Sequence, residues 1–198
     1  MITARPKDYF SFLGLPRKLN IDMADLEKRF RALSRQFHPD YFVNAPAAER
    51  RQSLEQSSYL NDAYRTLKNP SARLEYLLGL EGLALKGAQE ASKAVPPALL
   101  EEVFALNEEL DEVRELRAAG AAAEEWKPRL ERARAPIDAK REEHEAQLRI
   151  LSDRWDALVD GGRENAEGQE TLRALRERML ERSYINNLLA GIERELAT

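Results

Sequence analysis

The chain of 198 residues contains no cysteine and only two histidines. Without cysteine it can form no disulfide framework and no thiolate metal site, and it has no cysteine nucleophile. No stretch approaches the roughly 18 consecutive apolar residues of a membrane-spanning helix, so a membrane protein is not expected. The N-terminus also lacks the apolar core of a signal peptide. These absences predict a cytoplasmic protein, and no residue pattern calls for a cofactor or a metal.

Charged residues are abundant but unevenly distributed. They make up 33% of the chain beside 43% apolar residues, which suits a helical protein with charges along its exposed faces. Residues 1–82 contain 13 Lys and Arg against 10 Asp and Glu, whereas the rest contains 18 against 25. This asymmetry fits two faces with different partners, or charge scattered over a solvated surface. The net charge of −4 and the lack of a long basic run argue against nucleic acid as a partner.

Helical periodicity dominates the first half of the chain, and strand signals are nearly absent. A helix is predicted from Asp22, a good N-cap, to about Phe37. A second helix is expected over 47–68, and Asn69-Pro70 marks the N-cap and first residue of a third that ends near 79–82. The residues expected to face inward on the second helix are Leu54, Ser57, Leu60, Ala63, Tyr64 and Leu67.

A small, polar segment without periodicity, residues 83–96, is the predicted linker. Beyond it, residues 97–198 show three long amphipathic helical patterns, separated by Gly120 and by Gly161-Gly162. Pro136 lies inside the middle pattern and should bend or briefly break it. Long helices with short connections imply an antiparallel three-helix bundle. The middle helix carries residues that we interpret as packing residues: Trp126, His144 and Trp155.

The tripeptide His38-Pro39-Asp40 directly follows the helix predicted to end at Phe37. Pro39 cannot continue that helix and restricts His38 to an extended or turn conformation. His38 and Asp40 are therefore expected on a stiff, open corner between two helices, where the carboxylate can accept a bidentate arginine. There are two alternatives: His38 only caps free carbonyls of the preceding helix, or it is catalytic. Catalysis by His38 is the less supported alternative, because no nucleophile and no set of metal ligands lies near it in the sequence.

A basic helix face leads into this corner. Lys28, Arg31 and Arg35 share spacings of three and four, away from the apolar stripe, and Arg29 flanks them. Such a face is either an ordinary solvated surface or a docking surface that steers toward an acidic partner. Its continuity with the His38-Pro39-Asp40 turn favours docking.

Short motifs along nearly the whole chain carry a family resemblance. They are Asp8-Tyr9-Phe10 with Phe12-Leu13-Gly14-Leu15, Arg35-Gln36-Phe37-His38-Pro39-Asp40, Asn61-Asp62-Ala63-Tyr64, Arg73-Leu74-Glu75-Tyr76-Leu77-Leu78 and Asn107-Glu108-Glu109-Leu110-Asp111-Glu112. With them the chain resembles the J-domain proteins and, more narrowly, HscB, the J-type co-chaperone of iron–sulfur cluster assembly. The stretch from Arg73 to Leu78 is the most specific, because generic J-domains rarely carry it.

The resemblance implies an all-α, L-shaped monomer. A J-domain over 1–82, an antiparallel helical hairpin bearing the turn, would be joined to a C-terminal three-helix bundle over 97–198. The J-domain would use the turn and the basic face to recruit an Hsp70 chaperone of the HscA or DnaK type and stimulate its ATPase. The bundle would bind an IscU-type scaffold protein, on which the cluster is built. Such a protein has no enzymatic reaction of its own.

The first bundle helix carries a second candidate site. One row of residues lies beside the core row and forms either a docking strip or a wider part of the core: Leu100, Phe104, Glu108 and Glu112. The resemblance implies scaffold-binding residues on this helix and on the last one, at positions that match these four and Tyr184. Positions that depart from the family pattern are Glu101, Ala105 and Tyr41, the last where a lysine or arginine is common.

Two other functions stay open at this point. The chain could be a J-domain co-chaperone for a different client, which would not need the row on the first bundle helix. It could also be a passive helical scaffold protein whose tripeptide is accidental, which failure to stimulate any Hsp70 would show. An enzyme is the least supported function, for want of any nucleophile or metal constellation.

Overall fold

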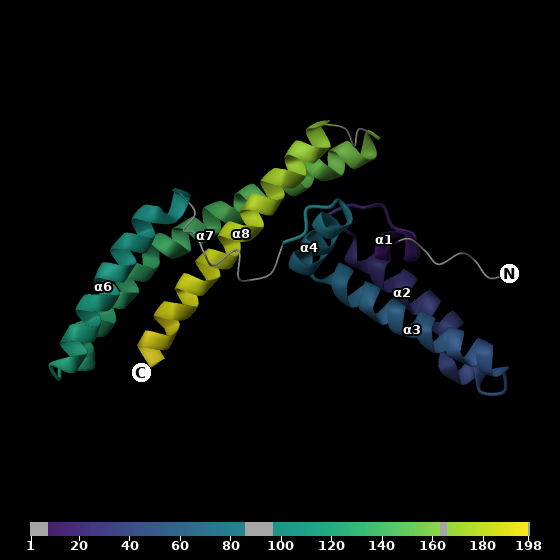
Figure 1. The fold of residues 1–198 in the computed structure, drawn as a ribbon, viewed down its shortest axis with the longest axis horizontal. Coiled ribbons are helices and arrows are strands. Elements are labelled where there is room, and N and C mark those ends of the chain that lie inside the picture. The colour runs from purple at the N-terminus through teal and green to yellow at the C-terminus, as the bar shows by residue number, and fades with distance from the viewer. Residues whose placement is uncertain (1–7, 86–96, 163–165, 198) are drawn as a thin grey trace. The chain divides into compact units, whose positions relative to one another are not determined.

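The computed structural model describes residues 8–85, 97–162 and 166–197, and every regular element in these ranges is a helix (Figure 1). The predicted all-α fold is therefore confirmed. The chain divides into two compact units. The first unit is Met1–Ala84 with Ser152–Leu172, and the second unit is Leu85–Leu151 with Arg173–Thr198.

The N-terminal helices of the first unit begin and end close to where the sequence predicts. They are α1 (Tyr9–Phe12), α2 (Met23–Phe37), the 3₁₀ helix η1 (Pro39–Phe42), α3 (Ala47–Lys68) and α4 (Pro70–Leu80). The Asp22 carboxylate accepts a hydrogen bond from the Ala24 N–H at 2.9 Å, and Asn69 caps α4 in the same way. The predicted caps are confirmed, because these side chains satisfy N–H groups that a helix start leaves without partners.

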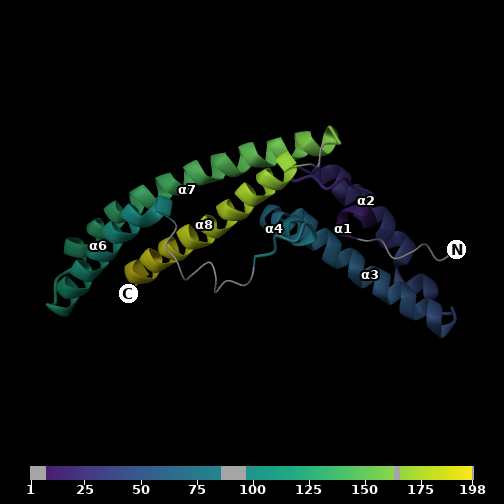
Figure 2. The ribbon, with the colours of Figure 1, turned by 45° about the horizontal axis from the view of Figure 1, so that its top comes forward.

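Helices α2 and α3 lie side by side in Figures 1 and 2. Buried side chains on these two helices are Leu26 of α2 and Leu60, Ala63 and Leu67 of α3. Beside them the ring of Phe30 stacks on Tyr64, with centroids 4.1 Å apart. Burial of each leucine contributes roughly 1.5–3 kcal/mol. This hairpin supports the connection between the two helices.

One inward-facing prediction on α3 is wrong. Leu54 is 58% exposed, and Ser53 beside it is buried. The Ser53 hydroxyl donates a hydrogen bond to the Phe37 carbonyl at 2.9 Å, one of the carbonyls for which the end of α2 leaves no helical partner. Since successive residues of a helix are about 100° apart, this contact turns Leu54 toward solvent.

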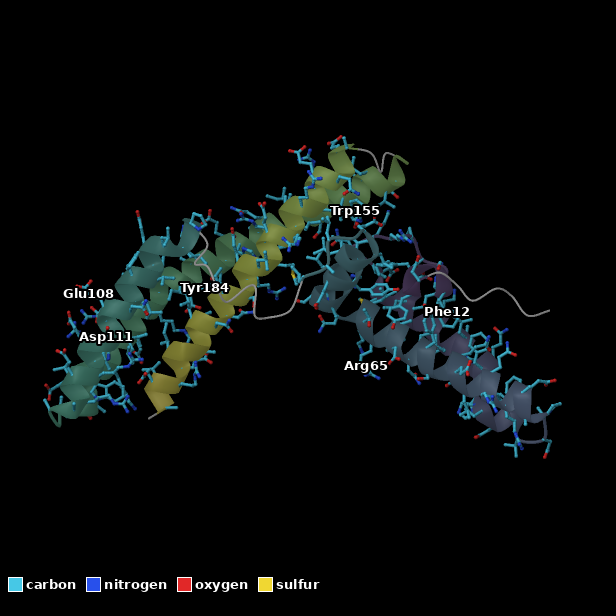
Figure 3. All side chains as sticks on the ribbon, viewed as in Figure 1. Phe12, Arg65, Glu108, Asp111, Trp155 and Tyr184 are labelled. Atoms are coloured by element: carbon cyan, nitrogen blue, oxygen red, sulfur yellow. The ribbon has the colours of Figure 1, made fainter. Side chains whose placement is uncertain are left out.

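The loop before α2 is held by residues distant in sequence but in the same unit. The Asp156 carboxylate accepts hydrogen bonds from the backbone N–H groups of Leu19 (2.6 Å) and Asn20 (2.8 Å). The Trp155 indole N–H donates to the Arg17 carbonyl at 2.8 Å. Burial raises the pKa of Asp156 despite its hydrogen bonds. Trp155, labelled in Figure 3, is a packing residue as predicted, but it packs in the first unit.

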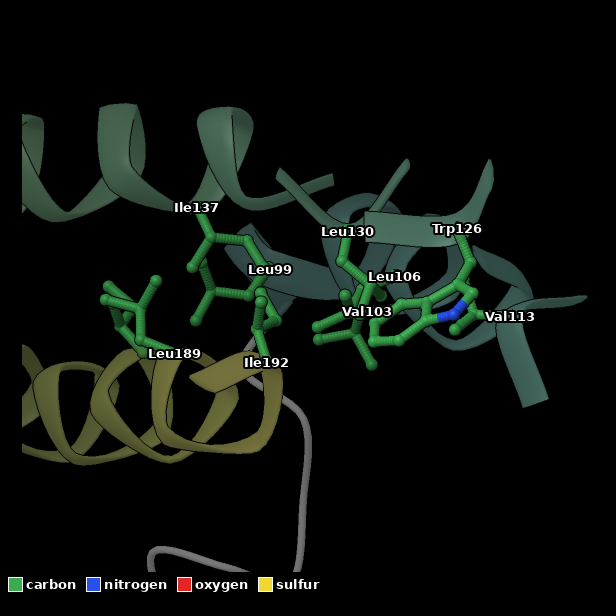
Figure 4. Close-up of a cluster of buried hydrophobic side chains, with 10 residues drawn as sticks. Leu99, Val103, Leu106, Val113, Trp126, Leu130, Ile137, Leu189 and Ile192 are labelled. Atoms are coloured by element: carbon green, nitrogen blue, oxygen red, sulfur yellow. The ribbon is translucent and has the colours of Figure 1, made fainter. Parts of the chain in front are cut away.

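The second unit is built from α6 (Leu100–Ala118) with the larger parts of α7 (Ala123–Asp160) and α8 (Ala166–Ala197), and η2 (Pro97–Leu99) precedes them. Figure 4 shows its apolar cluster, in which side chains of the three helices meet. The buried members are Leu99, Val103, Leu106, Val113, Trp126, Leu130, Ile137, Ile185, Leu189 and Ile192. Helix α7 continues through Pro136, so the break offered as one possibility does not occur.

The compact units do not coincide with the predicted domains. Residues 152–172 belong with the N-terminal helices, although the sequence places them inside a bundle over 97–198. These residues are tied to the loop before α2 by the hydrogen bond that Trp155 donates and by those that Asp156 accepts, and no local sequence pattern predicts these bonds. Of the predicted linker 83–96, residues 86–96 lie outside the described residues.

Candidate functional site

The predicted corner forms between α2 and α3. Helix α2 ends at Phe37, His38 is extended with φ −62° and ψ 125°, and Pro39 begins η1. The Asp40 backbone N–H donates to Nδ1 of His38 at 3.3 Å, and the Tyr41 N–H donates to the His38 carbonyl at 3.1 Å. His38 therefore caps η1, and the alternative in which it caps the carbonyls of α2 is wrong.

His38 and Asp40 face solvent at this corner. Their side chains are 49% and 83% exposed, and Oδ2 of Asp40 lies 3.6 Å from Nδ1 of His38. Neither side chain belongs to a core. The corner thus offers an imidazole and a carboxylate on a backbone that proline has stiffened. The carboxylate can accept a bidentate arginine from a partner.

Three of the four predicted cations are exposed on α2. Lys28, Arg31 and Arg35 all face solvent. Arg31 pairs with Glu27 one turn earlier. Lys28 and Arg35 form no ion pair with any residue that the structure describes. Their charges are therefore available to a partner, and they lead along α2 toward the turn.

Arg29 differs from the other three cations. Its Nε donates to Asp25 at 2.8 Å, and its Nη1 donates to the carbonyls of Leu13 (3.2 Å) and Gly14 (2.7 Å). Gly14 has φ +67°, and a Cβ at this position would lie 2.8 Å from Nη1 of Arg29. Arg29 thus holds the loop after α1 against α2.

The family-specific stretch from Arg73 to Leu78 connects helices of the first unit. Arg73 is buried and donates a hydrogen bond to the Leu67 carbonyl. Burial lowers the pKa of Arg73, although the charge of Asp156 acts in the opposite direction. The Tyr76 hydroxyl accepts a hydrogen bond from the Tyr9 N–H at 3.0 Å, and the two rings stack with centroids 4.4 Å apart. The Arg73 contact joins α4 to α3 and the Tyr76 contacts join α4 to α1, so the motif has a structural role.

The predicted row on α6 is open to solvent. Phe104 is 70% exposed and Leu100 is 40% exposed, whereas Leu99 and Val103 next to them are buried in the apolar cluster. The alternative in which the row widens the core is therefore wrong. Side chains four residues apart share one helix face. Burying such a pair against a partner would contribute roughly 1.5–3 kcal/mol for each side chain.

Acidic side chains continue the row beyond this apolar pair. Glu108 is exposed and forms no ion pair within the described ranges. Glu112 pairs with Arg129 of α7, which also binds Glu109 at 3.0 Å. Glu109 and then Glu112 raise the pKa of Arg129. The charge of Glu108 is thus available to a partner, whereas that of Glu112 is partly neutralised.

Asp111, identified from the sequence only as part of the acidic motif, lies on this face of α6, whereas Tyr184 lies on the last helix as predicted. Asp111 lies seven residues after Phe104, on the same face of α6. Its side chain is 73% exposed and pairs with Arg114 at 3.0 Å, so its charge is partly neutralised. Figure 3 shows Asp111 and Glu108 on this helix. The seven-residue spacing is the signal that identifies Asp111. Tyr184 lies on α8, where it packs half-buried against the apolar cluster.

The two histidines of the chain lie in different units. His144 is buried, as predicted for a packing residue, with Nδ1 3.5 Å from Oε2 of Glu181. Burial, followed by the charges of Arg178 and Arg182, lowers the pKa of His144. Among the residues described, no group of three or more His, Asp or Glu could hold a metal ion. No helix in the same ranges is long and apolar enough to cross a membrane.

Comparisons with known proteins agree with this geometry. Residues 8–76 match the DnaJ domain. The chaperone HscB from Vibrio cholerae is 29% identical, with a TM-score of 0.59 over 94% of this chain and 96% of that one. The human co-chaperone HscB is 25% identical, with a TM-score of 0.62 over 98% of this chain and 84% of that one.

A DnaJ domain that exposes a His-Pro-Asp turn defines this chain as a J-domain protein. The likeness to HscB from two organisms extends over more than 90% of its length. The DnaJ domain and the similarity to HscB over nearly the whole chain confirm the predicted resemblance to the HscB-type J-domain co-chaperones. The chain is a co-chaperone of iron–sulfur cluster assembly that works with an Hsp70.

Proposed function

We propose that this co-chaperone binds an IscU-type scaffold protein through α6 and delivers it to an Hsp70 of the HscA or DnaK type. It stimulates the ATPase of that Hsp70 through the His38-Pro39-Asp40 turn. It acts as a monomer and catalyses no reaction of its own. The division into a J-domain over 1–82, a linker and a bundle over 97–198 stays a prediction, as does the cytoplasmic location.

The Hsp70-binding surface in this proposal consists of the turn and the exposed cations Lys28, Arg31 and Arg35. The cations raise the rate of encounter with an acidic surface. The Asp40 carboxylate then stabilises the complex by accepting hydrogen bonds from an arginine of the Hsp70. Arg29 contributes indirectly, because its bonds to the Leu13 and Gly14 carbonyls keep α1 in place beside α2.

The scaffold-binding surface is supported by one observation above all, the exposure of Phe104 and Leu100 beside a buried core. Large apolar side chains that face solvent together on a helix are typical of a docking surface. The carboxylates of Glu108 and Asp111 continue the same face, so the complementary partner surface combines an apolar pocket with basic residues. Glu112 and Tyr184 border the contact, and both are already engaged within the second unit.

Calorimetric titration of the purified full chain with an IscU-type scaffold protein tests this proposal. We expect a one-to-one complex whose affinity falls as salt rises, because Glu108 and Asp111 are screened over about 8 Å at physiological ionic strength. An Asp40→Asn chain should bind the scaffold equally well. Absence of binding at millimolar protein, with stimulation of an Hsp70 intact, would point instead to a different client.

A further inference from the structure

Tyr41 directly follows the turn and stands where related proteins commonly have a lysine or arginine. Its side chain is 73% exposed. Even so, its ring stands edge-on to the His38 imidazole, with centroids 5.9 Å apart and planes inclined by 67°. An aromatic side chain so exposed contributes little to a core, so core packing does not explain this contact.

The hydrogen bond at His38 defines which imidazole nitrogen carries the proton. Nδ1 accepts from the Asp40 backbone N–H at 3.3 Å, so the proton of the neutral ring lies on Nε2. The Asp40 carboxylate lies 3.6 Å from the same Nδ1 and would accept a hydrogen bond from it if Nδ1 carried the proton. The backbone and the side chain of Asp40 therefore favour opposite tautomers of His38.

We propose that Tyr41 is a positioning residue of this turn. Its ring holds the imidazole so that Nδ1 accepts the hydrogen bond of the Asp40 N–H. The Nε2–H group then stays a donor, and the Asp40 carboxylate receives no hydrogen bond from His38. This inference rests on the proposed function, because those two groups are the ones offered to the Hsp70. The matching Hsp70 surface presents an acceptor oxygen for Nε2–H close to an arginine for the carboxylate. A lysine at position 41 has no ring with which to hold the imidazole.

Nitrogen NMR of the isotope-labelled full chain reports the tautomer without any Hsp70. We expect the Nε2–H form of His38 at neutral pH in the wild type and in Tyr41→Phe, which keeps the ring. Tyr41→Ala should give a mixture of the two tautomers. The signals of His144, buried in the second unit, should not change and serve as the internal reference. Identical His38 signals in the wild type and in Tyr41→Ala would overturn the proposal.

Stimulation of the Hsp70 ATPase gives the second measurement. Half-maximal stimulation should need about three- to tenfold more Tyr41→Ala chain, as expected for loss of an edge-to-face ring contact. Tyr41→Phe should behave as the wild type. The matched control is Val43→Ala, because Val43 is 61% exposed and apolar but makes no ring contact. An equal loss in Val43→Ala would show a general apolar contact and overturn the role of the ring.

The failure of this inference and the failure of the proposed function give different results. If His38→Gln leaves stimulation intact, the turn does not act on the Hsp70, and the proposed function itself is wrong. If His38→Gln abolishes stimulation while Tyr41→Ala has no effect, only the positioning role of Tyr41 is wrong.

Discussion

The groups proposed for docking stand on different kinds of structure in the two units. In the first unit the groups stand on a turn, whose geometry depends on Pro39 and on the hydrogen bond to His38. In the second unit they stand on the outer face of α6, whose position depends on the apolar cluster behind it. A turn is fixed by local covalent and hydrogen-bond geometry, whereas a helix face is fixed by side-chain packing. The two sites should therefore respond to different substitutions.

The two surfaces also differ in what they offer a partner. The first combines exposed cations on α2 with one carboxylate at Asp40, and the second combines Phe104 and Leu100 with the carboxylates of Glu108 and Asp111. Surfaces of opposite charge favour different partners and disfavour exchange between them. In the proposed function, one chain would therefore hold an Hsp70 and a scaffold protein without competition for a single site.

The largest effect is expected at the turn. Asp40→Asn removes the charge that accepts an arginine, and His38→Gln removes the imidazole, so each should abolish stimulation of the Hsp70 ATPase. Phosphate release at steady state measures this loss. The circular dichroism of both variants should match that of the wild type, because both side chains are exposed and neither belongs to a core. A variant that stays folded and still stimulates would remove the turn from the mechanism.

The next largest effect is expected on α6. Replacing Leu100 and Phe104 together by Ala should weaken scaffold binding by about 2–4 kcal/mol, the range of apolar anchors at an interface. Calorimetry measures the affinity. The matched control is Ile150→Ala, because Ile150 is 67% exposed on α7 of the same unit. Equal losses in the two proteins would show that exposed apolar area, and not the α6 row, decides binding.

Stability of the first unit should depend on Asp156. Asp156→Asn leaves an amide facing the N–H of Leu19 or Asn20, and this should cost about 1–3 kcal/mol of unfolding free energy. Urea unfolding, followed by Trp155 fluorescence in a Trp126→Phe background, measures the change. Asp160→Asn is the control, because the Asp160 side chain is 66% exposed and, among the described residues, its one ion pair is with Lys18. Equal stability of both variants would contradict a structural role for Asp156 in this unit.

The smallest effect is expected on the basic face of α2. Arg31→Glu should raise the concentration for half-maximal Hsp70 stimulation by about two- to fivefold, in keeping with exposed charges. Arg65→Glu on α3 is a matched control, because both arginines are exposed and have an acidic partner one turn earlier, Glu27 and Asp62. The difference between the variants should shrink as salt rises. Equal effects from the two reversals would exclude the basic face.

Local features of the first unit could be predicted from the sequence. The caps at Asp22 and Asn69 and the end of α2 at Phe37 follow from the chemistry of neighbouring residues, and the structure has them as predicted. The exposure of Leu100 and Phe104 could not be decided in this way. An apolar stripe on a helix has the same period whether its edge is buried or exposed to solvent. Only the packing of α6 therefore distinguishes a docking strip from a wider core.

Polar contacts between residues far apart in the chain could not be predicted from the sequence, for a different reason. Asp156 binds the Leu19 N–H across 137 residues, and Ser53 binds the Phe37 carbonyl across 16. Periodicity reports which residues share a face of one helix, but it carries no information about which backbone group a distant side chain satisfies. The inward position predicted for Leu54 differs from the structure for this reason, and for the same reason the grouping of residues 152–172 with the N-terminal helices was not predicted.

Single-turnover ATP hydrolysis by the Hsp70, with and without the scaffold protein, tests most directly whether one chain carries two separable docking sites. The wild type should stimulate alone and stimulate further with the scaffold. The Leu100→Ala/Phe104→Ala chain should match the wild type alone and lose only the further stimulation. Asp40→Asn should stimulate in neither case while still binding the scaffold. If the double variant retained the full scaffold-dependent stimulation, the α6 site would be contradicted.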